Sequence, residues 1–382
     1  MKKAYFAAAF TLMTIAGASR ADVTIGVVIS TTGPGASLGI PERNTVQILP
    51  ETVGGQKAHY IVVDDASDPT QAVKQGRKLV DEEKVDLILG PSTTPTSLAL
   101  LEVAGESQTP MFSLAGSSTI VVPLEGNKQW AFKLAPSEAT MSEYVFDDMR
   151  ARKLTSLAYI AFASSFGDSF VTELNRLAPI HNVKVVASEK YNPADTSVAA
   201  QVLKVMAANP DAVFIAASGT PGALPVIELR KRNYKGQIYL QQGIASPDFL
   251  RVAGADANGI MFPVSPVLVA EQLSDANQSK KMAVQYVTRY EAKFGPGSRS
   301  LFGASLWDAY ALLDKAMPMA TAVAQPGTPT FRKALRDALE KTGEVAGAQG
   351  VFTVTNKDHN GTDRRAQVMV KVENGKWVLN RE

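Results

Sequence analysis

The sequence predicts an α/β protein made of two doubly wound parallel-sheet lobes. Its 382 residues exceed what one hydrophobic core usually holds, which indicates about two domains. Short segments rich in Val, Ile and Ala alternate with segments of helical spacing, as in strand–helix–strand units. The alternation runs twice, with a break near Trp130–Pro136. Because strands that are apolar on both sides suit parallel sheets covered by helices, we expect two such sheets.

The apolar segments place the strands in chain order. We expect strands at Val23–Ser30, Tyr60–Asp64, Asp86–Leu89 and Met111–Leu114 in the first lobe, and at Leu157–Ala161, Lys184–Ala187, Ala212–Ala216 and Ile238–Leu240 in the second. Between Tyr60–Asp64 and Asp86–Leu89, a helix is expected to begin with Asp68 as its N-cap and Pro69 at its first position, where both residue types are favoured.

The last third of the chain departs from this alternation. After a second crossing near Pro263–Pro266, it is expected to be helical from about Ser279 to Lys341. It then ends with the strand-like segments Gly350–Thr355 and Gln367–Val372. Since no flexible Gly/Ser-rich run marks the crossings, they are interpreted as hinge strands between the lobes.

Residues 1–21 are predicted to be a secretory signal peptide. Lys2 and Lys3 precede an apolar run, and the small residues Ser19 and Ala21 stand where a cleavage site requires them. The apolar run is shorter than the ~20 residues that span a bilayer. No cysteine follows Ala21 for lipid attachment, so we expect an unanchored protein exported to the periplasm.

Composition and motifs argue against most enzyme classes and against cofactors. The formal net charge of +2 is too small for a nucleic-acid-binding surface. With no cysteine and three scattered histidines, thiol catalysis and His- or Cys-based metal sites are not expected. Gly33-Pro34-Gly35 lacks the third glycine of a dinucleotide fingerprint, and no Walker or nucleophile-elbow motif is present.

Polar, small residues follow the predicted strands in both lobes. These strand-end segments are 90–97, 115–119, 164–168, 218–221 and 241–243. Ligands of open α/β sheets bind beyond the carboxyl ends of the strands, where helix N-termini offer free N–H groups to anions. Each hydroxyl there could instead be an ordinary helix cap. Their clustering favours a cleft that binds a small anionic ligand between the lobes.

Several motifs in order resemble the leucine/isoleucine/valine-type periplasmic solute-binding proteins of ABC importers. They are the segments 25–28, 30–34, 64–69, 90–91 and 307–310. The resemblance implies a periplasmic binding protein type I fold, with three hinge crossings between lobes. It implies lobe one at 22–136 plus 267–345 and lobe two at 137–266 plus 346–382. It also implies a monomeric receptor, not an enzyme, that delivers a small solute to a membrane permease.

The resemblance also implies site residues. By spacing from Gly90, the group that holds the ligand's carboxylate falls on Thr94, with Ala115 and Ser117 after the next strand. An aromatic residue at the edge of the second lobe falls on Phe166.

Two positions depart from the pattern of amino-acid-binding members. Gln242 stands where they place an acid for the ligand's ammonium group, and Gly219-Thr220 stands where they place a tyrosine. Because a neutral amide cannot offset a buried cation, the sequence favours a carboxylate without an ammonium group, for example an aromatic acid. A branched-chain amino acid is the alternative. More remote alternatives are a ligand sensor subunit and an enzyme on the same fold.

Overall fold

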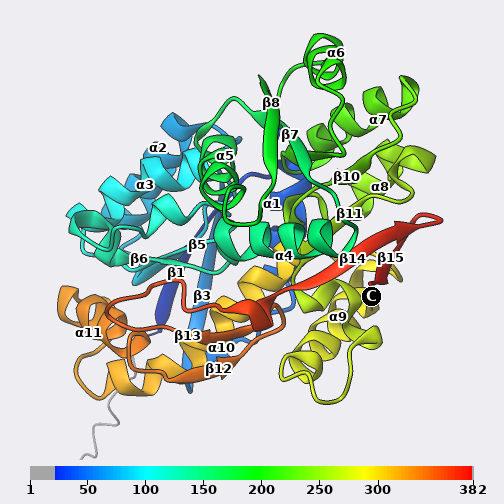
Figure 1. Cartoon of the computed structure of the whole chain (residues 1–382). Coiled ribbons are helices and arrows are strands. Elements are labelled where there is room, and N and C mark those ends of the chain that lie inside the picture. Colours follow the sequence, from blue (N-terminus) through cyan, green and yellow to red (C-terminus); the bar gives the residue numbers. More distant parts are fainter. Residues whose placement is uncertain (1–21, 381–382) are drawn as a thin grey trace, which may run out of the picture.

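The computed structural model describes residues 22–380, so the predicted signal peptide lies outside the described residues. It shows two large β-sheets, each flanked by helices, and a further two-stranded sheet (Figure 1). The α/β architecture of two doubly wound lobes is therefore confirmed. Both sheets are mainly parallel, and antiparallel strands occur at their edges.

The first sheet contains β1 (Val23–Ile29), β2 (Thr52–Val53), β3 (Gln56–Asp64), β4 (Leu87–Leu89), β5 (Met111–Ser113) and β6 (Ala131–Lys133), in the order β2-β3-β1-β4-β5-β6. Its lobe also contains α1 (Ala36–Val46), α2 (Pro69–Asp81), α3 (Thr94–Glu106), α10 (Leu301–Thr321) and α11 (Pro329–Leu339). Alternate residues of β1 face opposite cores: Val27 packs with α10 and α11, and Val28 packs with α2 and α3. Helices therefore cover both faces of this sheet.

The second sheet contains β7 (Ser156–Phe162), β8 (Lys184–Tyr191), β9 (Ala212–Ala216), β10 (Gln237–Tyr239), β11 (Met261–Val264), β14 (Val368–Glu373) and β15 (Lys376–Leu379), in the order β15-β14-β11-β10-β9-β7-β8. The second lobe contains the helices α4 (Glu138–Ala151), α5 (Ser165–Leu177), α6 (Ala199–Ala207), α7 (Ala223–Lys231) and α8 (Pro247–Ala253). After β11 the chain continues into α9 (Lys280–Phe294), which contacts α10. Short 3₁₀ turns are η1 (Ser118–Ile120), η2 (Gly126–Trp130), η3 (Thr220–Gly222), η4 (Gln242–Ile244), η5 (Gly254–Ala257), η6 (Pro266–Gln272) and η7 (Arg364–Ala366).

The predicted strands of the two lobes are present, with shifted ends. The strand predicted from Tyr60 begins at Gln56, and the one predicted to end at Ala187 continues to Tyr191. The helix α2 begins as expected, because the Asp68 side chain accepts a hydrogen bond from the Gln71 N–H and Pro69 occupies the first turn. The short strands β6 and β11 lie at the two crossings that were interpreted as hinge strands, whereas β2 and β15 were not predicted.

The third crossing differs from the expected boundary at 345–346. A hairpin of β12 (Glu344–Ala346) and β13 (Val351–Thr353) follows α11, and Phe352 and Val354 lie in the core of the first lobe. The Asn360 side chain then donates hydrogen bonds to the carbonyls of Lys133 and Ala135, beside the first crossing. The chain joins the second sheet only at β14. Burial of the hairpin's apolar side chains against α10 and α11 keeps this segment with lobe one.

Candidate functional site

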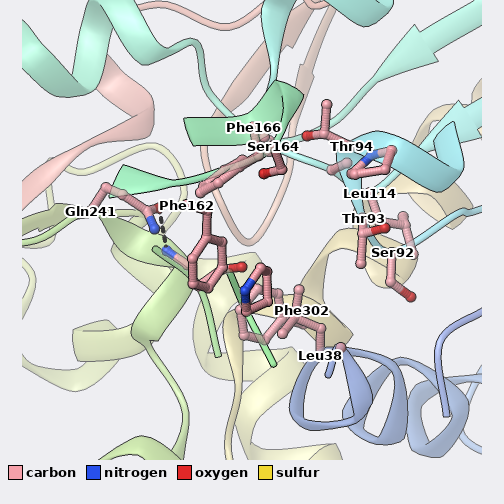
Figure 2. Close-up of a pocket in the computed structure, with 18 of the residues that line it drawn as sticks. Leu38, Ser92, Thr93, Thr94, Leu114, Phe162, Ser164, Phe166, Gln241 and Phe302 are labelled. Carbon is pink, nitrogen blue, oxygen red and sulfur yellow. Dashed lines mark hydrogen bonds between the residues drawn. The ribbon is translucent and has the colours of Figure 1, made fainter. Parts of the chain in front are cut away.

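A cavity lies between the two lobes, at the carboxyl ends of strands from both sheets (Figure 2). Its volume is about 890 Å³ when the space at its open mouth is included. The first-lobe half and α10 contribute Pro34, Gly35, Leu38, Ser67, Ser92, Thr93, Thr94, Pro95, Leu114, Ala115, Gly116, Leu301 and Phe302. The first crossing and the second lobe contribute Ala135, Met141, Phe162, Ser164, Phe166, Pro193, Ser218, Gln241, Gln242 and Gly243.

The side chains that line the cavity are all uncharged. Hydroxyls and amides supply its polar atoms, and Phe, Leu, Met and Pro supply most of the remaining wall. An ionised ligand therefore meets dipoles rather than a countercharge. This arrangement suits an anion held by N–H and O–H donors, but it leaves a cation without a partner.

Thr94, which was expected to hold the ligand's carboxylate, lies at the start of α3. Its side chain is buried, lines the cavity, and its Oγ1 has no hydrogen-bond partner. The N-cap Thr93 makes no side-chain cap hydrogen bond, since its hydroxyl bonds Thr96 instead. Buried hydroxyls are normally paired, so the unpaired Oγ1 beside an uncapped helix N-terminus offers a donor to an anionic ligand.

Ser92, two residues earlier on the same wall, was not predicted. Its Oγ accepts a hydrogen bond of 2.9 Å from the Ser30 N–H and is also hydrogen-bonded to the buried carboxyl of Glu42 on α1. The Ser30 hydroxyl in turn donates to Asp65 at 2.6 Å. Burial, with a smaller contribution from Asp65, raises the pKa of Glu42 well above its usual value, although the hydrogen bond from Ser92 opposes this shift.

Ala115 lines the cavity and Ser117 does not. The Ala115 N–H donates to the Ser113 hydroxyl at 3.2 Å. Ser117 is fully buried, and its hydroxyl caps η1 by accepting from the Thr119 N–H while also bonding the Thr119 hydroxyl. The structure therefore uses Ser117 for a local turn and does not bring it to the cavity wall.

Phe166 reaches the cavity from the second lobe, as expected. Its ring lies 6.4 Å from that of Phe162, which also lines the cavity, and both appear in Figure 2. Gly116 of the first lobe makes room for it, because a Cβ at Gly116 would lie 3.0 Å from the Phe166 ring. Phe302 from α10 adds a third aromatic side chain to the wall. These rings form an apolar surface for a ligand's body.

Gly219 and Thr220 lie outside the cavity lining and make a contact between the lobes. The Thr220 N–H donates to the Ser37 hydroxyl of α1 at 3.3 Å. Gly219 has φ 62° and ψ −162°, a conformation that is essentially restricted to glycine. Its Cβ would lie 2.6 Å from the Ser37 Oγ. The two residues therefore let the lobes approach closely.

Gln242 lines the cavity and connects it to two crossings. Its Oε1 accepts hydrogen bonds from the Ser265 hydroxyl at 2.9 Å and from the Gln367 amide at 3.3 Å. The neighbouring Gln241, which the sequence did not single out, donates to the Ala217 carbonyl and accepts from the Gly243 N–H. Both amides are neutral groups; Gln241 is held in place by backbone groups and Gln242 by the side chains of Ser265 and Gln367.

Other site residues missed from the sequence are mainly apolar. Leu38 and Phe302 come from helices, Phe162 ends β7, and Leu114 directly follows β5. No local pattern separates such side chains from the core. Ser92 had a signal, since it belongs to the polar segment after β4.

Two further properties concern residues 22–380. No group of three or more His, Asp and Glu side chains among them could hold a metal ion. No helix within this range is both long enough and apolar enough to cross a membrane.

Comparisons with known proteins agree with this architecture. An extracellular ligand-binding receptor from Rhodopseudomonas palustris HaA2 is 39% identical, with a TM-score of 0.91 over 94% of this chain and 100% of that one. The Leu/Ile/Val-binding protein homolog 3 of Brucella melitensis is 23% identical over 256 residues, 65% of this chain and 68% of that protein. A solute-binding protein of an ABC transporter from R. palustris, solved in complex with benzoate, is 19% identical, with a TM-score of 0.79 over 94% of this chain and 95% of that one.

The family model for periplasmic binding proteins matches residues 22–376, almost the whole described chain. Together with the two-lobed fold and the cavity between the sheets, this match shows that the chain belongs to the periplasmic binding protein family, as a member of its leucine/isoleucine/valine type.

Proposed function

We propose that this chain is the solute receptor of an ABC importer and that it binds a small carboxylate without an ammonium group, with an aromatic body, in the cavity between the lobes. The observation that carries the ligand class is the cavity wall, whose side chains are all uncharged. An α-amino acid would leave its ammonium without a carboxylate partner, and an unpaired buried charge is costly.

The polar and apolar parts of the wall support the same ligand. The unpaired Thr94 hydroxyl and the N-terminus of α3 provide donors for a carboxylate. Phe162, Phe166 and Phe302 provide rings against which an aromatic body can pack. The fold neighbour that was solved with benzoate adds a precedent for this ligand class on the same fold.

A thermal-shift screen followed by calorimetry tests the ligand class, because a ligand that binds only the folded state raises the melting temperature. The pair 4-methylpentanoate and leucine isolates the ammonium group, because the two compounds differ by that group alone. The pair benzoate and benzylamine compares a carboxylate with an ammonium group on the same ring. We expect both carboxylates to bind and both ammonium compounds to be weaker or silent. Tight leucine binding without any response to benzoate would falsify the proposal in favour of a branched-chain amino acid, the ligand that the name of the Brucella relative suggests.

We further propose that residues 1–21 are removed on export and that the receptor then works in the periplasm with a membrane permease. The exported protein should begin at Asp22, which N-terminal sequencing checks. Retention of residues 1–21 on the exported protein would contradict this.

A further inference from the structure

A buried carboxyl group lies directly behind the cavity wall. Glu42 of α1 is fully buried, its Oε2 is hydrogen-bonded to the hydroxyl of Ser92, and its Oε1 has no hydrogen-bond partner. None of the ion pairs seen within residues 22–380 includes Glu42. Ser92 itself lines the cavity, beside Thr93 and Thr94 (Figure 2). One hydroxyl therefore separates this acid from the ligand space.

The groups that face Glu42 do not neutralise a negative charge on it. Asp65, after β3, is a second buried acid whose Oδ2 lacks a partner. Tyr286 of α9 is a buried phenol whose pKa is raised by burial, and it interacts with both Glu42 and Asp308 of α10. Since burial and acidic neighbours both disfavour ionisation, the pKa of Glu42 lies well above its usual value.

The hydrogen-bond capacity of Ser92 then decides what the ligand meets. A serine hydroxyl has one proton to donate and two lone pairs to accept. The Ser30 N–H already occupies one lone pair. If Glu42 is ionised, the single Ser92 proton must go to Glu42, and only a lone pair remains for the cavity. If Glu42 is neutral, its O–H can fill the second lone pair, and the Ser92 proton is free to face the cavity.

We infer that Glu42 is a positioning residue for anion binding: as a neutral acid it donates to Ser92, and Ser92 donates its own proton to the ligand's carboxylate. This inference rests on the proposed function. No bond other than hydrogen bonds changes, and the proton stays on Glu42 in the complex. Binding of the anion is thereby linked to the presence of a proton on Glu42.

The linkage has a definite sign. Below the pKa of Glu42 in the unliganded protein, the proton is already present and affinity does not depend on it. As pH rises through that pKa, the proton must be taken up on binding, and the affinity falls by up to about tenfold per pH unit for one linked proton. The ligand carboxylate stays ionised throughout this range and does not contribute.

The test measures benzoate affinity by calorimetry between about pH 5 and pH 10, in two buffers of different ionisation enthalpy so that proton uptake is read directly. If benzoate is silent in the screen, 4-methylpentanoate is the probe. The wild-type protein should lose affinity and take up a proton at the alkaline end. Glu42→Gln, whose amide donates to Ser92 at every pH, should bind as tightly as the wild type at low pH and show a flat profile. Ser92→Ala should bind more weakly at low pH, also with a flat profile.

Three outcomes overturn the inference in different ways. A flat wild-type pH profile without proton uptake would show that binding is not linked to a proton on Glu42. This outcome is measured on the wild-type protein alone, so it does not depend on whether a variant folds. An unchanged pH profile in Glu42→Gln assigns the linkage to another group. Failure of every carboxylate to bind at any pH overturns the proposed function and this inference with it, whereas carboxylate binding without pH dependence overturns the inference alone.

Discussion

Thr94 and Ser117 show how differently two hydroxyls with the same sequence context can be used. Both follow neighbouring strands of the first sheet, and both were expected to hold the carboxylate. The Ser117 hydroxyl is hydrogen-bonded within its own turn, to Thr119. The Thr94 hydroxyl is buried with no partner at the cavity wall. A hydroxyl serves as a cap or as a ligand donor, and only its surroundings decide between the two.

Replacing Thr94 with valine should separate ligand binding from stability. The change keeps the side-chain shape and removes a hydroxyl that has no partner in the protein, so the free energy of unfolding should change by less than about 1 kcal/mol. Loss of a hydrogen bond to a charged carboxylate should weaken benzoate binding about 10- to 100-fold. Calorimetric titration and chemical denaturation measure the two effects.

Thr96→Val on the same helix is the matched control for Thr94→Val. The Thr96 hydroxyl bonds Thr93 and does not line the cavity. This control should lose about 1 kcal/mol of stability and bind benzoate with nearly unchanged affinity. Equal affinities for Thr94→Val and the wild type would remove Thr94 from the site.

Among the elements, the loops after the strands serve the cavity and the contact between the lobes. The loop into α3 and the turn η4 line the cavity, whereas the loop into η3 adds Ser218 to the lining and also touches α1 of the other lobe. Gly219, the N-cap of η3, enables that contact through a backbone conformation reserved for glycine and a missing side chain facing Ser37. The absence of a side chain at Gly219 therefore allows the two lobes to approach each other.

Gly219→Ala should impair closure more than folding of the second lobe. The backbone strain costs roughly 1–3 kcal/mol, and the new Cβ would collide with Ser37 and Leu38 across the cleft. An opened cleft relieves the collision, so benzoate affinity should fall by more than the strain alone accounts for. Gly375→Ala in the β14–β15 turn, with φ 71° and open space around it, controls for strain without a collision. Equal loss of affinity in both variants would contradict a role of Gly219 in closure.

At the scale of the whole molecule, contacts across the cleft and along the crossings are connected. Ser37 meets Thr220, and Gly116 meets Phe166, so the lobes touch at two places. Gln242 joins the cavity wall to the second and third crossings through Ser265 and Gln367. A ligand that contacts both lobes therefore favours the closed arrangement over an open one.

Cysteines placed across the cleft should report this closure. The chain has no cysteine of its own, so Ser37→Cys with Thr220→Cys introduces the only thiols. Saturating benzoate should speed formation of the disulfide, because closure holds the two residues together. Gel mobility after timed oxidation measures the rate. Ser137→Cys with Thr140→Cys, within one turn of α4, is the control and should bridge at a rate that does not depend on ligand. A cross-cleft rate that ignores benzoate would argue against closure on the ligand.

The fold was predictable from the sequence to a large extent, and the site only in part. Parallel strands buried on both faces leave an unmistakable apolar pattern, so the strands around Val27 and Ile215 were placed correctly. The predicted boundary at 345–346 divided the β12–β13 hairpin and placed β13 in lobe two, because a short apolar segment does not reveal which core buries it. Phe302 was missed because the other residues that line the cavity with it, such as Phe162, lie far away in the chain.

The sequence alone was enough to predict the two α/β lobes, the small and polar character of the strand-end loops, and the place of Thr94 directly after a strand. These depend on local periodicity and on residue type, which are written along the chain. The three-dimensional packing was needed to show that Ser117 is a turn residue, that Gly219 allows the contact between the lobes, and that Glu42 lies behind Ser92. Each of these depends on which group hydrogen-bonds to a hydroxyl or which residue packs against a glycine. Those neighbours are set by the packing of the folded chain.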